Sequence, residues 1–336
     1  MIITYYWPPA GGPGVQRILK FVKYLPQFGW EPIVLTVANG EYPAIDHSLE
    51  KDIPEGIKVY KTKTIEPFRI FKFLSGKKKK ENIDTFILDK KSKSFFSSFF
   101  SFIRSNIFLP DARVGWLPLA TKKAKKIIKD HNISIILTSS PPHSVQLIGL
   151  KLKSELGATW VADFRDPWID AFWEKGEKRL NWVKNKLSYY EKEVFRNANL
   201  LITVTKSFKR NFEKKYSNSN IVYLPNGYDS SDFKSIEKKI NDVFIIRYFG
   251  SIAASQIPHN LLSVLKSEKP SEVILELYGN FDQSILELAN EIDVIQIMDY
   301  LPHNLITTKM QTADLLLLLI PSSRGDICPG MWFEYI

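Results

Sequence analysis

Ten apolar segments alternate with helical patterns along this chain, and that alternation constrains the fold more than any other feature. Several of the segments are continuously apolar, which is typical of strands buried on both faces of a sheet. Strands that alternate with helices predict parallel sheets with helical crossover connections. The predicted strands are Ile2–Tyr5, Ile33–Thr36, Ile133–Thr138, Trp160–Asp163, Leu200–Val204, Ile221–Leu224, Phe244–Phe249, Val273–Tyr278, Val294–Ile297 and Leu315–Ile320.

A polar break separates two such α/β series. The chain has 336 residues, which favours two domains over one. The first series ends at Pro225-Asn226-Gly227, and Ser230–Asn241 is polar. We therefore predict an α/β protein with a Rossmann-like domain over 1–228, a linker over 229–242 and a second domain over 243–336. The predicted helices include Val15–Phe28, Leu117–Asp130, Val145–Leu156 and Trp182–Arg196.

The net charge of +10 is unevenly distributed. Residues 1–240 carry 41 Lys and Arg against 24 Asp and Glu, whereas residues 241–336 carry 5 against 12. The first part, with a net charge of +17, is expected to meet an anionic partner, and a solvated basic surface is the alternative. The chain has no zinc-finger spacing and no aromatic RNA-binding signature, so we expect no nucleic-acid partner.

The stretch Glu66–Asn106 interrupts the alternation and is predicted to be an insertion or a surface element. It contains the lysine run Lys77–Lys80 and most of the aromatic stretch Phe95–Phe108. Lysines attract anionic lipids and aromatic rings insert at the headgroup level, so we predict contact with an anionic membrane surface. The alternative is that Phe95–Phe108 packs as an ordinary core helix.

Three further features predict a cytoplasmic protein, peripheral at the inner face of the membrane if it binds lipid. The single cysteine, Cys328, fits a reducing compartment. No apolar run reaches about 18 residues, the length that a spanning helix requires. The first residues lack a basic leader and run directly into Pro8 and Pro9, unlike a signal peptide.

A glycine-rich loop follows the first predicted strand and precedes a helix. Its glycines, Gly11, Gly12 and Gly14, would let backbone amides approach a phosphate at a helix N-terminus. A dinucleotide fingerprint requires a third glycine at position 17, which is Arg17, so the nicotinamide interpretation fails. A plain tight turn is the alternative to an anion-binding loop.

Two polar loops follow later strands, at the edge where open α/β sheets form their ligand crevice. In Ser139-Ser140-Pro141-Pro142-His143, His143 is a candidate for binding or proton transfer, although a lone histidine can simply pack or cap. The loop Asp163-Phe164-Arg165-Asp166-Pro167-Trp168 offers hydroxyl acceptors and an anion clamp in Asp163, Arg165 and Asp166. An internal ion-pair network is the alternative for these charges.

The last motif is the segment from Arg324 to Ile336. Asp326 and Glu334 lie eight positions apart, and Gly330 between them would let a helix N-terminus approach a diphosphate. A carboxylate at Glu334 suits ribose hydroxyl groups.

Together these elements resemble the family-four glycosyltransferases of the GT-B fold, chiefly bacterial surface-polysaccharide enzymes. The resemblance also includes the opening Tyr6-Trp7-Pro8-Pro9 and the Pro225-Asn226-Gly227-Tyr228-Asp229 stretch. It implies that Glu334 holds the donor ribose, that Asp326 faces the sugar and that Arg165 stands where relatives often carry a histidine near that sugar. The glycine loop and the turn at Gly250 and Ser251 would then line the donor cleft.

The implied activity is metal-independent, retaining transfer of a sugar from a nucleoside-diphosphate sugar to a cell-surface glycan or lipid-linked acceptor, with no cofactor. Helix N-termini and Arg17, Arg165 or Arg324 would meet the charge of the leaving group. The turn Gly250–Ser255 has no basic residue, and Met331 stands where many relatives have lysine. The sequence also stops soon after Gly330, whereas relatives continue for several more elements, so the resemblance implies that the nucleotide-sugar donor-binding domain over 243–336 is truncated. The alternatives are therefore a non-catalytic truncated remnant or partner subunit, or a sugar-nucleotide epimerase of the same fold.

Overall fold

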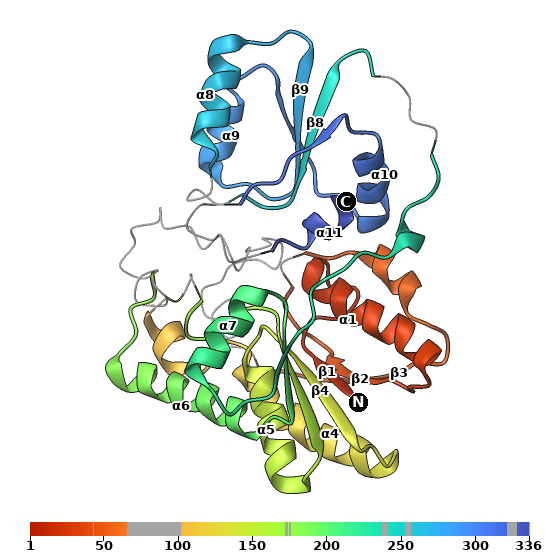
Figure 1. Cartoon of the computed structure of the whole chain (residues 1–336), viewed down its shortest axis with the longest axis vertical. Coiled ribbons are helices and arrows are strands. Elements are labelled where there is room, and N and C mark those ends of the chain that lie inside the picture. Colours follow the sequence, from red (N-terminus) through yellow and green to blue (C-terminus); the bar gives the residue numbers. More distant parts are fainter. Residues whose placement is uncertain are drawn as a thin grey trace. The chain divides into compact units, whose positions relative to one another are not determined.

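The chain folds into two units, shown in a computed structural model (Figure 1). The structure describes residues 1–42, 44–65, 102–171, 174, 176–236, 241–252, 257–320 and 328–335. Unit 1 comprises Met1–Ile45 and Glu50–Pro225, and unit 2 comprises Asp46–Leu49 and Asn226–Ile336. The predicted boundary after residue 228 remains a prediction. Most of the predicted insertion Glu66–Asn106, including Lys77–Lys80, lies outside the described residues.

Unit 1 is built on a seven-stranded parallel sheet with the order β3-β2-β1-β4-β5-β6-β7. Strand β1 lies near the middle, where Ile2 is in register with Val34 of β2 on one side and with Leu137 of β4 on the other. Its three residues are all buried, as expected for a central strand covered on both faces. The strands are β1 (Ile2–Thr4), β2 (Ile33–Val37), β3 (Lys58–Thr62), β4 (Ile135–Ser140), β5 (Thr159–Phe164), β6 (Leu200–Thr203) and β7 (Ile221–Tyr223).

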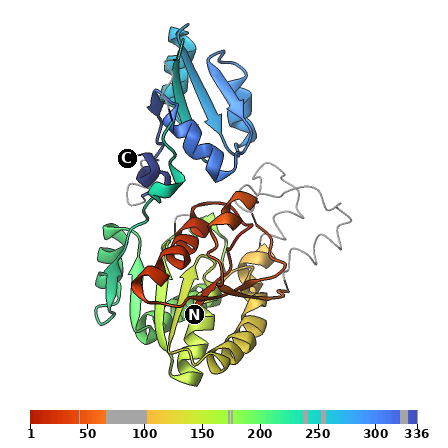
Figure 2. The ribbon, with the colours of Figure 1, turned by 90° about the vertical axis from the view of Figure 1, so that its right-hand side faces the viewer.

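Helices connect these strands and cover both faces of the sheet. Helix α1 begins directly after Gly12, whose φ of 98° favours glycine, and it buries Val15, Ile18 and Leu19 against the sheet. Figure 2 shows α1 and α4 on opposite sides of the sheet. Among the described residues, the helices of unit 1 include α1 (Pro13–Tyr24), α4 (Leu117–Asp130), α5 (Ser144–Leu156), α6 (Asn181–Asn197), α7 (Lys206–Lys215) and a short helical segment over 102–107, with 3₁₀ turns at Leu25–Phe28 and Val114–Trp116.

Unit 2 repeats this architecture around a four-stranded parallel sheet with the order β10-β9-β8-β11. Neighbouring residues of β8 face opposite sides, so Tyr248 joins the core under α8 and α9 while Phe249 joins the core under α10 (Figure 1). The elements are β8 (Phe244–Phe249), α8 (His259–Glu268), β9 (Val273–Tyr278), α9 (Gln283–Ala289), β10 (Ile295–Met298), α10 (His303–Gln311), β11 (Leu315–Leu316) and α11 (Met331–Tyr335), with a 3₁₀ turn at Ser230–Asp232. A further 3₁₀ turn, His47–Asp52, has residues in both units.

The predicted fold class, two parallel α/β units, is confirmed. All ten predicted strands are present, and β8 and β9 have the predicted bounds. Strand β3 was not predicted from the sequence. In this edge strand, two partly buried residues separate the exposed Lys58 and Lys61. Charged residues are common on edge strands because they discourage pairing with other chains, and here they concealed the strand pattern.

Candidate functional site

The loops of unit 1 that carry the sequence motifs all leave the carboxyl ends of neighbouring strands. The connections after β1 and β4 run in opposite directions along the sheet, toward β2 and toward β5. Such a reversal point is where open α/β sheets bind their ligands. The glycine loop follows β1, the loop ending at His143 follows β4, and the loop containing Arg165 follows β5.

Arg165 brings these three loops together. Its Nε donates to the Ser140 carbonyl at 3.0 Å, and its Nη2 donates to the Pro141 carbonyl at 2.5 Å. A Cβ atom on Gly14 would lie 1.8 Å from Nη1 of Arg165, so glycine at position 14 is required by the guanidinium beside it. Burial lowers the pKa of Arg165, and the carboxylates of Asp163 and Asp166 act against that shift.

Asp163 and Arg17 form a buried ion pair beneath this loop. Nη2 of Arg17 lies 3.0 Å from Oδ1 of Asp163, and Nε of Arg17 donates to Oδ2 at 3.2 Å. Arg17 also donates to the carbonyls of Leu224 and Pro225, and Ser139 donates its hydroxyl to Asp163 at 2.7 Å. Because the Asp163 side chain is fully buried, these contacts tie α1, β4, β5 and the segment after β7 together.

His143 lies between aromatic rings at the start of α5. Its ring stacks on Trp168 with a centroid distance of 5.0 Å and an interplanar angle of 6°, and Phe164 lies 6.1 Å away. The residue is buried, and within the described part of the chain neither ring nitrogen has a hydrogen-bond partner. Burial, together with the positive charge of Arg165, lowers the pKa of His143 to about 3, although the Pro167 backbone opposes this shift. The ring is therefore neutral at physiological pH.

Glu191, which the sequence reading did not identify, anchors the end of this loop. Its Oε2 accepts a hydrogen bond from the Ile169 amide at 3.0 Å. Its Oε1 accepts from Lys215 at 2.7 Å and from the Tyr216 hydroxyl at 2.6 Å. The side chain is fully buried in the middle of α6. No local motif marks this glutamate, because its partners come from two other elements.

In unit 2 two glycine backbones meet at the carboxyl ends of β8 and β9. Gly250 has a φ of 143° and Gly279 a φ of 140°, both values that favour glycine. A Cβ on Gly279 would lie 2.1 Å from the Gly250 carbonyl oxygen, and a Cβ on Gly250 would lie 3.0 Å from Cε of Met331. The two backbones are therefore packed closely together, and a side chain at position 279 would collide with the Gly250 carbonyl. Ser251, the next predicted site residue, is exposed.

Glu334, the predicted ribose ligand, lies in α11 and contacts the start of α10. Its Oε1 is 2.8 Å from Nε2 of His303, and both side chains are largely buried. The backbone amide of His303 donates to Asp46 at 2.8 Å, and Nδ1 of His303 lies 3.9 Å from Asp232. Glu334 was predicted from the sequence, whereas its neighbour His303 and the Asp46 that holds His303 were not.

The structure thus gathers the predicted residues into two groups. Unit 1 brings together those of its motif loops, and unit 2 places Glu334, Gly330, Gly250 and Ser251 in or beside α11 and the turn after β8. Arg324 and Asp326 lie outside the described residues. The unit 1 group is Gly11, Gly12, Gly14, Arg17, His143, Asp163, Arg165 and Asp166.

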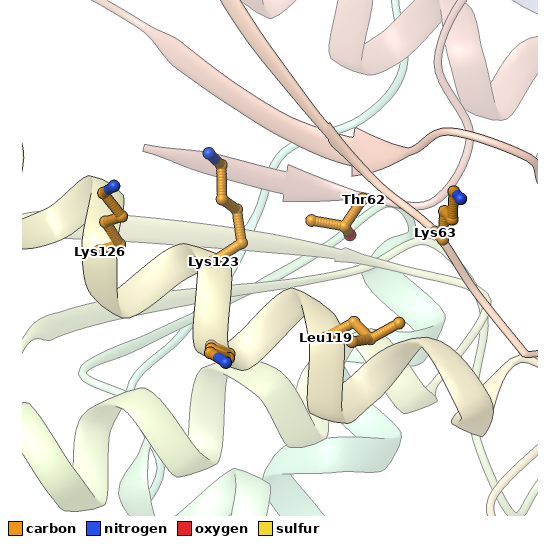
Figure 3. A pocket seen from close by; sticks show the side chains of 6 residues that line it. Thr62, Lys63, Leu119, Lys123 and Lys126 are labelled. Carbon is orange, nitrogen blue, oxygen red and sulfur yellow. The ribbon is translucent and has the colours of Figure 1, made fainter.

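A separate pocket of about 410 Å³ lies between the carboxyl end of β3 and α4. Lysine side chains from α4 and from the residue after β3 surround Leu119 and Thr62 there (Figure 3). Its lysines are Lys63, Lys122, Lys123 and Lys126. None of the helices in the described ranges is long and apolar enough to cross a membrane.

The comparisons with known proteins agree with this geometry. The profile of the family described as Glycosyltransferase Family 4 matches residues 86–232. Over this segment the chain resembles the family-four glycosyltransferases. No curated protein sequence matches the chain significantly.

Solved structures of other proteins share the fold of this chain across both units. Sucrose-phosphate synthase from Thermosynechococcus elongatus is 13% identical with a TM-score of 0.60, over 94% of this chain and 74% of that one. HepE from Anabaena, in complex with UDP and glucose, is 15% identical with a TM-score of 0.53, over 94% and 73%. A TarM variant from S. aureus, in complex with fondaparinux, α-GlcNAc-glycerol and UDP, is 13% identical with a TM-score of 0.57, over 94% and 80%. The predicted resemblance to GT-B glycosyltransferases is confirmed.

Proposed function

We propose that this glycosyltransferase moves a sugar from a nucleoside-diphosphate sugar to a cell-surface glycan or lipid-linked acceptor, with retention of the anomeric configuration. The observation that carries the proposal is the family-four match over 86–232, joined to the GT-B fold. The complexes of HepE and TarM with UDP give the donor class a precedent on the same fold.

We place the donor nucleotide at the carboxyl edge of the unit 2 sheet. The turn at Gly250 and Ser251 follows β8 at this edge, and Glu334 supplies acceptors for ribose hydroxyl groups. Arg324 and Asp326 keep their predicted roles, the first as a counter-charge to the diphosphate and the second facing the sugar. No metal is required by this scheme, because cations of the chain neutralise the leaving group.

The reaction breaks the bond between the anomeric carbon and the phosphate oxygen, and the electron pair leaves with the nucleoside diphosphate. An acceptor hydroxyl oxygen forms the new bond to that carbon, and its proton passes to the departing phosphate oxygen. In unit 1 the described partners of the Arg17 guanidinium include the carboxylate of Asp163, whereas Arg165 donates to two neutral carbonyls. Arg165 holds the three motif loops together at the carboxyl edge of the sheet, and we propose it as the unit 1 cation of the site.

Product analysis with a panel of sugar nucleotides tests this proposal. A transferase forms a glycoside and releases the nucleoside diphosphate, and nuclear magnetic resonance of the product reports retention or inversion. Glu334→Ala and Arg165→Ala are the site variants, and Lys209→Ala on the exposed face of α7 is the control. Conversion of the donor into an epimer would favour the epimerase alternative. Donor binding without turnover would favour a non-catalytic remnant or partner subunit.

We further propose that unit 1 contacts an anionic membrane surface. Support comes from the lysines of the pocket between β3 and α4, which line it together with an exposed apolar side chain, Leu119 (Figure 3). Each lysine near an anionic surface contributes on the order of 1 kcal/mol.

Vesicle co-sedimentation tests this surface. Binding should require anionic lipid, fall with added salt and weaken in Lys122→Gln/Lys126→Gln and in a variant with glutamine at Lys77–Lys80. Lys266→Gln/Lys269→Gln in unit 2 removes two charges, as Lys122→Gln/Lys126→Gln does, and serves as the control for that variant. Binding that ignores lipid charge and salt would refute the electrostatic account.

A further inference from the structure

The tetrapeptide Pro-His-Asn-Leu begins two helices of unit 2, and its histidine has a different environment in each. It occurs at 258–261, where His259 starts α8, and at 302–305, where His303 starts α10. His259 is exposed to solvent, whereas His303 is buried, with 7% of the residue exposed. Since the local sequence is the same, the difference arises from what surrounds His303.

His303 is fixed by contacts around both its ring and its backbone. Its backbone amide donates to Oδ2 of Asp46 at 2.8 Å. Nε2 of its ring lies 2.8 Å from Oε1 of Glu334, and Nδ1 lies 3.9 Å from Oδ2 of Asp232. With the ring proton on Nε2, the imidazole donates to Glu334. The ring therefore has a defined orientation before any ligand binds.

Glu334, by contrast, lies on a helix that cannot fix it alone. Helix α11 has five described residues, and helices this short are marginal in water without tertiary contacts. The Glu334 side chain is 12% exposed, so it requires a hydrogen-bond partner. A carboxylate accepts about four hydrogen bonds, so donation from His303 leaves acceptor sites for a ligand.

We propose that His303 is a positioning residue for donor binding: it holds the Glu334 carboxylate in the orientation that receives the ribose hydroxyl groups of a nucleoside diphosphate. This inference rests on the proposed function and adds to it a residue that does not touch the nucleotide. It acts through Glu334, and its removal leaves a correctly placed helix with a carboxylate that is free to rotate.

Calorimetry with matched nucleotides tests the proposal. We would take whichever of UDP, GDP, ADP and CDP the wild-type protein binds, and compare it with its 2′,3′-dideoxy counterpart. Wild-type protein should prefer the hydroxylated nucleotide by about tenfold to hundredfold, the size of a hydrogen bond to a charged group. Glu334→Ala and His303→Leu should both reduce this preference by about tenfold or more.

Two variants separate positioning from a general loss of structure. His303→Gln should retain part of the preference, because the glutamine amide reaches the place of Nε2, whereas His303→Asn is too short and should lose it. These two carry the comparison if His303→Leu fails to fold. His259→Leu, at the equivalent position of α8, should bind both nucleotides as wild type does.

The outcomes of the experiment are distinct. A preference that Glu334→Ala loses and His303→Leu keeps would overturn this inference and leave the proposed function standing. Equal preferences in His303→Gln and His303→Asn would also overturn it. If the wild-type protein binds the nucleotide and its 2′,3′-dideoxy counterpart equally well, Glu334 does not bind the ribose and His303 has no role in positioning it. Failure of the wild type to bind any of the four nucleotides would reject the proposed donor class itself.

Discussion

Removing the charge of Arg17 should destabilise unit 1 strongly, because it isolates a buried carboxylate. Arg17→Met keeps a long apolar side chain but deletes the two contacts at 3.0 and 3.2 Å to Asp163. It also leaves the carbonyls of Leu224 and Pro225 without these two hydrogen bonds. Breaking one partner of a buried ion pair typically costs about 3–5 kcal/mol. For a unit of this size each kcal/mol lowers the melting temperature by about 2–4 °C, so we expect a decrease of roughly 6–20 °C.

Urea unfolding followed by tryptophan fluorescence measures this effect, because seven of the eight tryptophans belong to unit 1 and only Trp332 to unit 2. Lys209→Met is the control, since its pair with Glu213 is 3.6 Å long and exposed and should contribute at most about 1 kcal/mol. The double variant Arg17→Met/Asp163→Leu should recover much of the lost stability, because no uncompensated charge remains. If Arg17→Met costs no more than Lys209→Met, or if the double variant recovers nothing, the buried pair does not stabilise unit 1.

Three further substitutions address the candidate site. His143→Phe should keep the stack on Trp168 and remove the loss of stability that wild type suffers in acid, because burial lowers the pKa of His143 to about 3 against roughly 6.5 when unfolded. Between these two pH values the unfolded state binds one more proton than the folded state. As the pH falls, the unfolding free energy of wild type should therefore decrease more steeply than that of the variant, by up to about 1.4 kcal/mol per pH unit. Parallel pH profiles of the two proteins would contradict this. Gly14→Ala should lower transfer activity with a small change in melting temperature, because its methyl group displaces the Arg165 guanidinium, and full activity would show that Arg165 is not needed there. Glu334→Ala should weaken binding of the donor nucleotide by about 1–3 kcal/mol in calorimetry, and equal affinity would remove it from the site.

The fold was predictable because buried parallel strands leave a strong local signal. The continuously apolar strands β8 and β9 were predicted to the residue, whereas β3 was missed because Lys58 and Lys61 interrupt its apolar pattern. Strand β11 was predicted over six residues and pairs over only two, Leu315 and Leu316. Apolar composition does not tell how far a strand remains hydrogen-bonded to its neighbour.

The loops that form the candidate site were predictable from the sequence, but the side-chain contacts between distant residues were not. Motifs that follow strands identify the carboxyl edge of each sheet, and Arg165 and Glu334 were found in this way. Their partners come from distant parts of the chain: Asp163 pairs with Arg17, and Glu334 pairs with His303. His303 carries no local signal, since His259 has the same neighbours in sequence and remains exposed.

The central position of β1 also sets an order of events during synthesis. Its residues leave the ribosome before those of β2, with which they can pair soon afterwards. The other edge of β1 must wait for β4, which is made only after the whole stretch between Val37 and Ile135. At typical rates of about 5–20 residues per second, on the order of 100 residues take roughly 5–20 s. For that interval the nascent chain exposes an apolar strand edge, which makes it a natural client for chaperones that bind early on the ribosome.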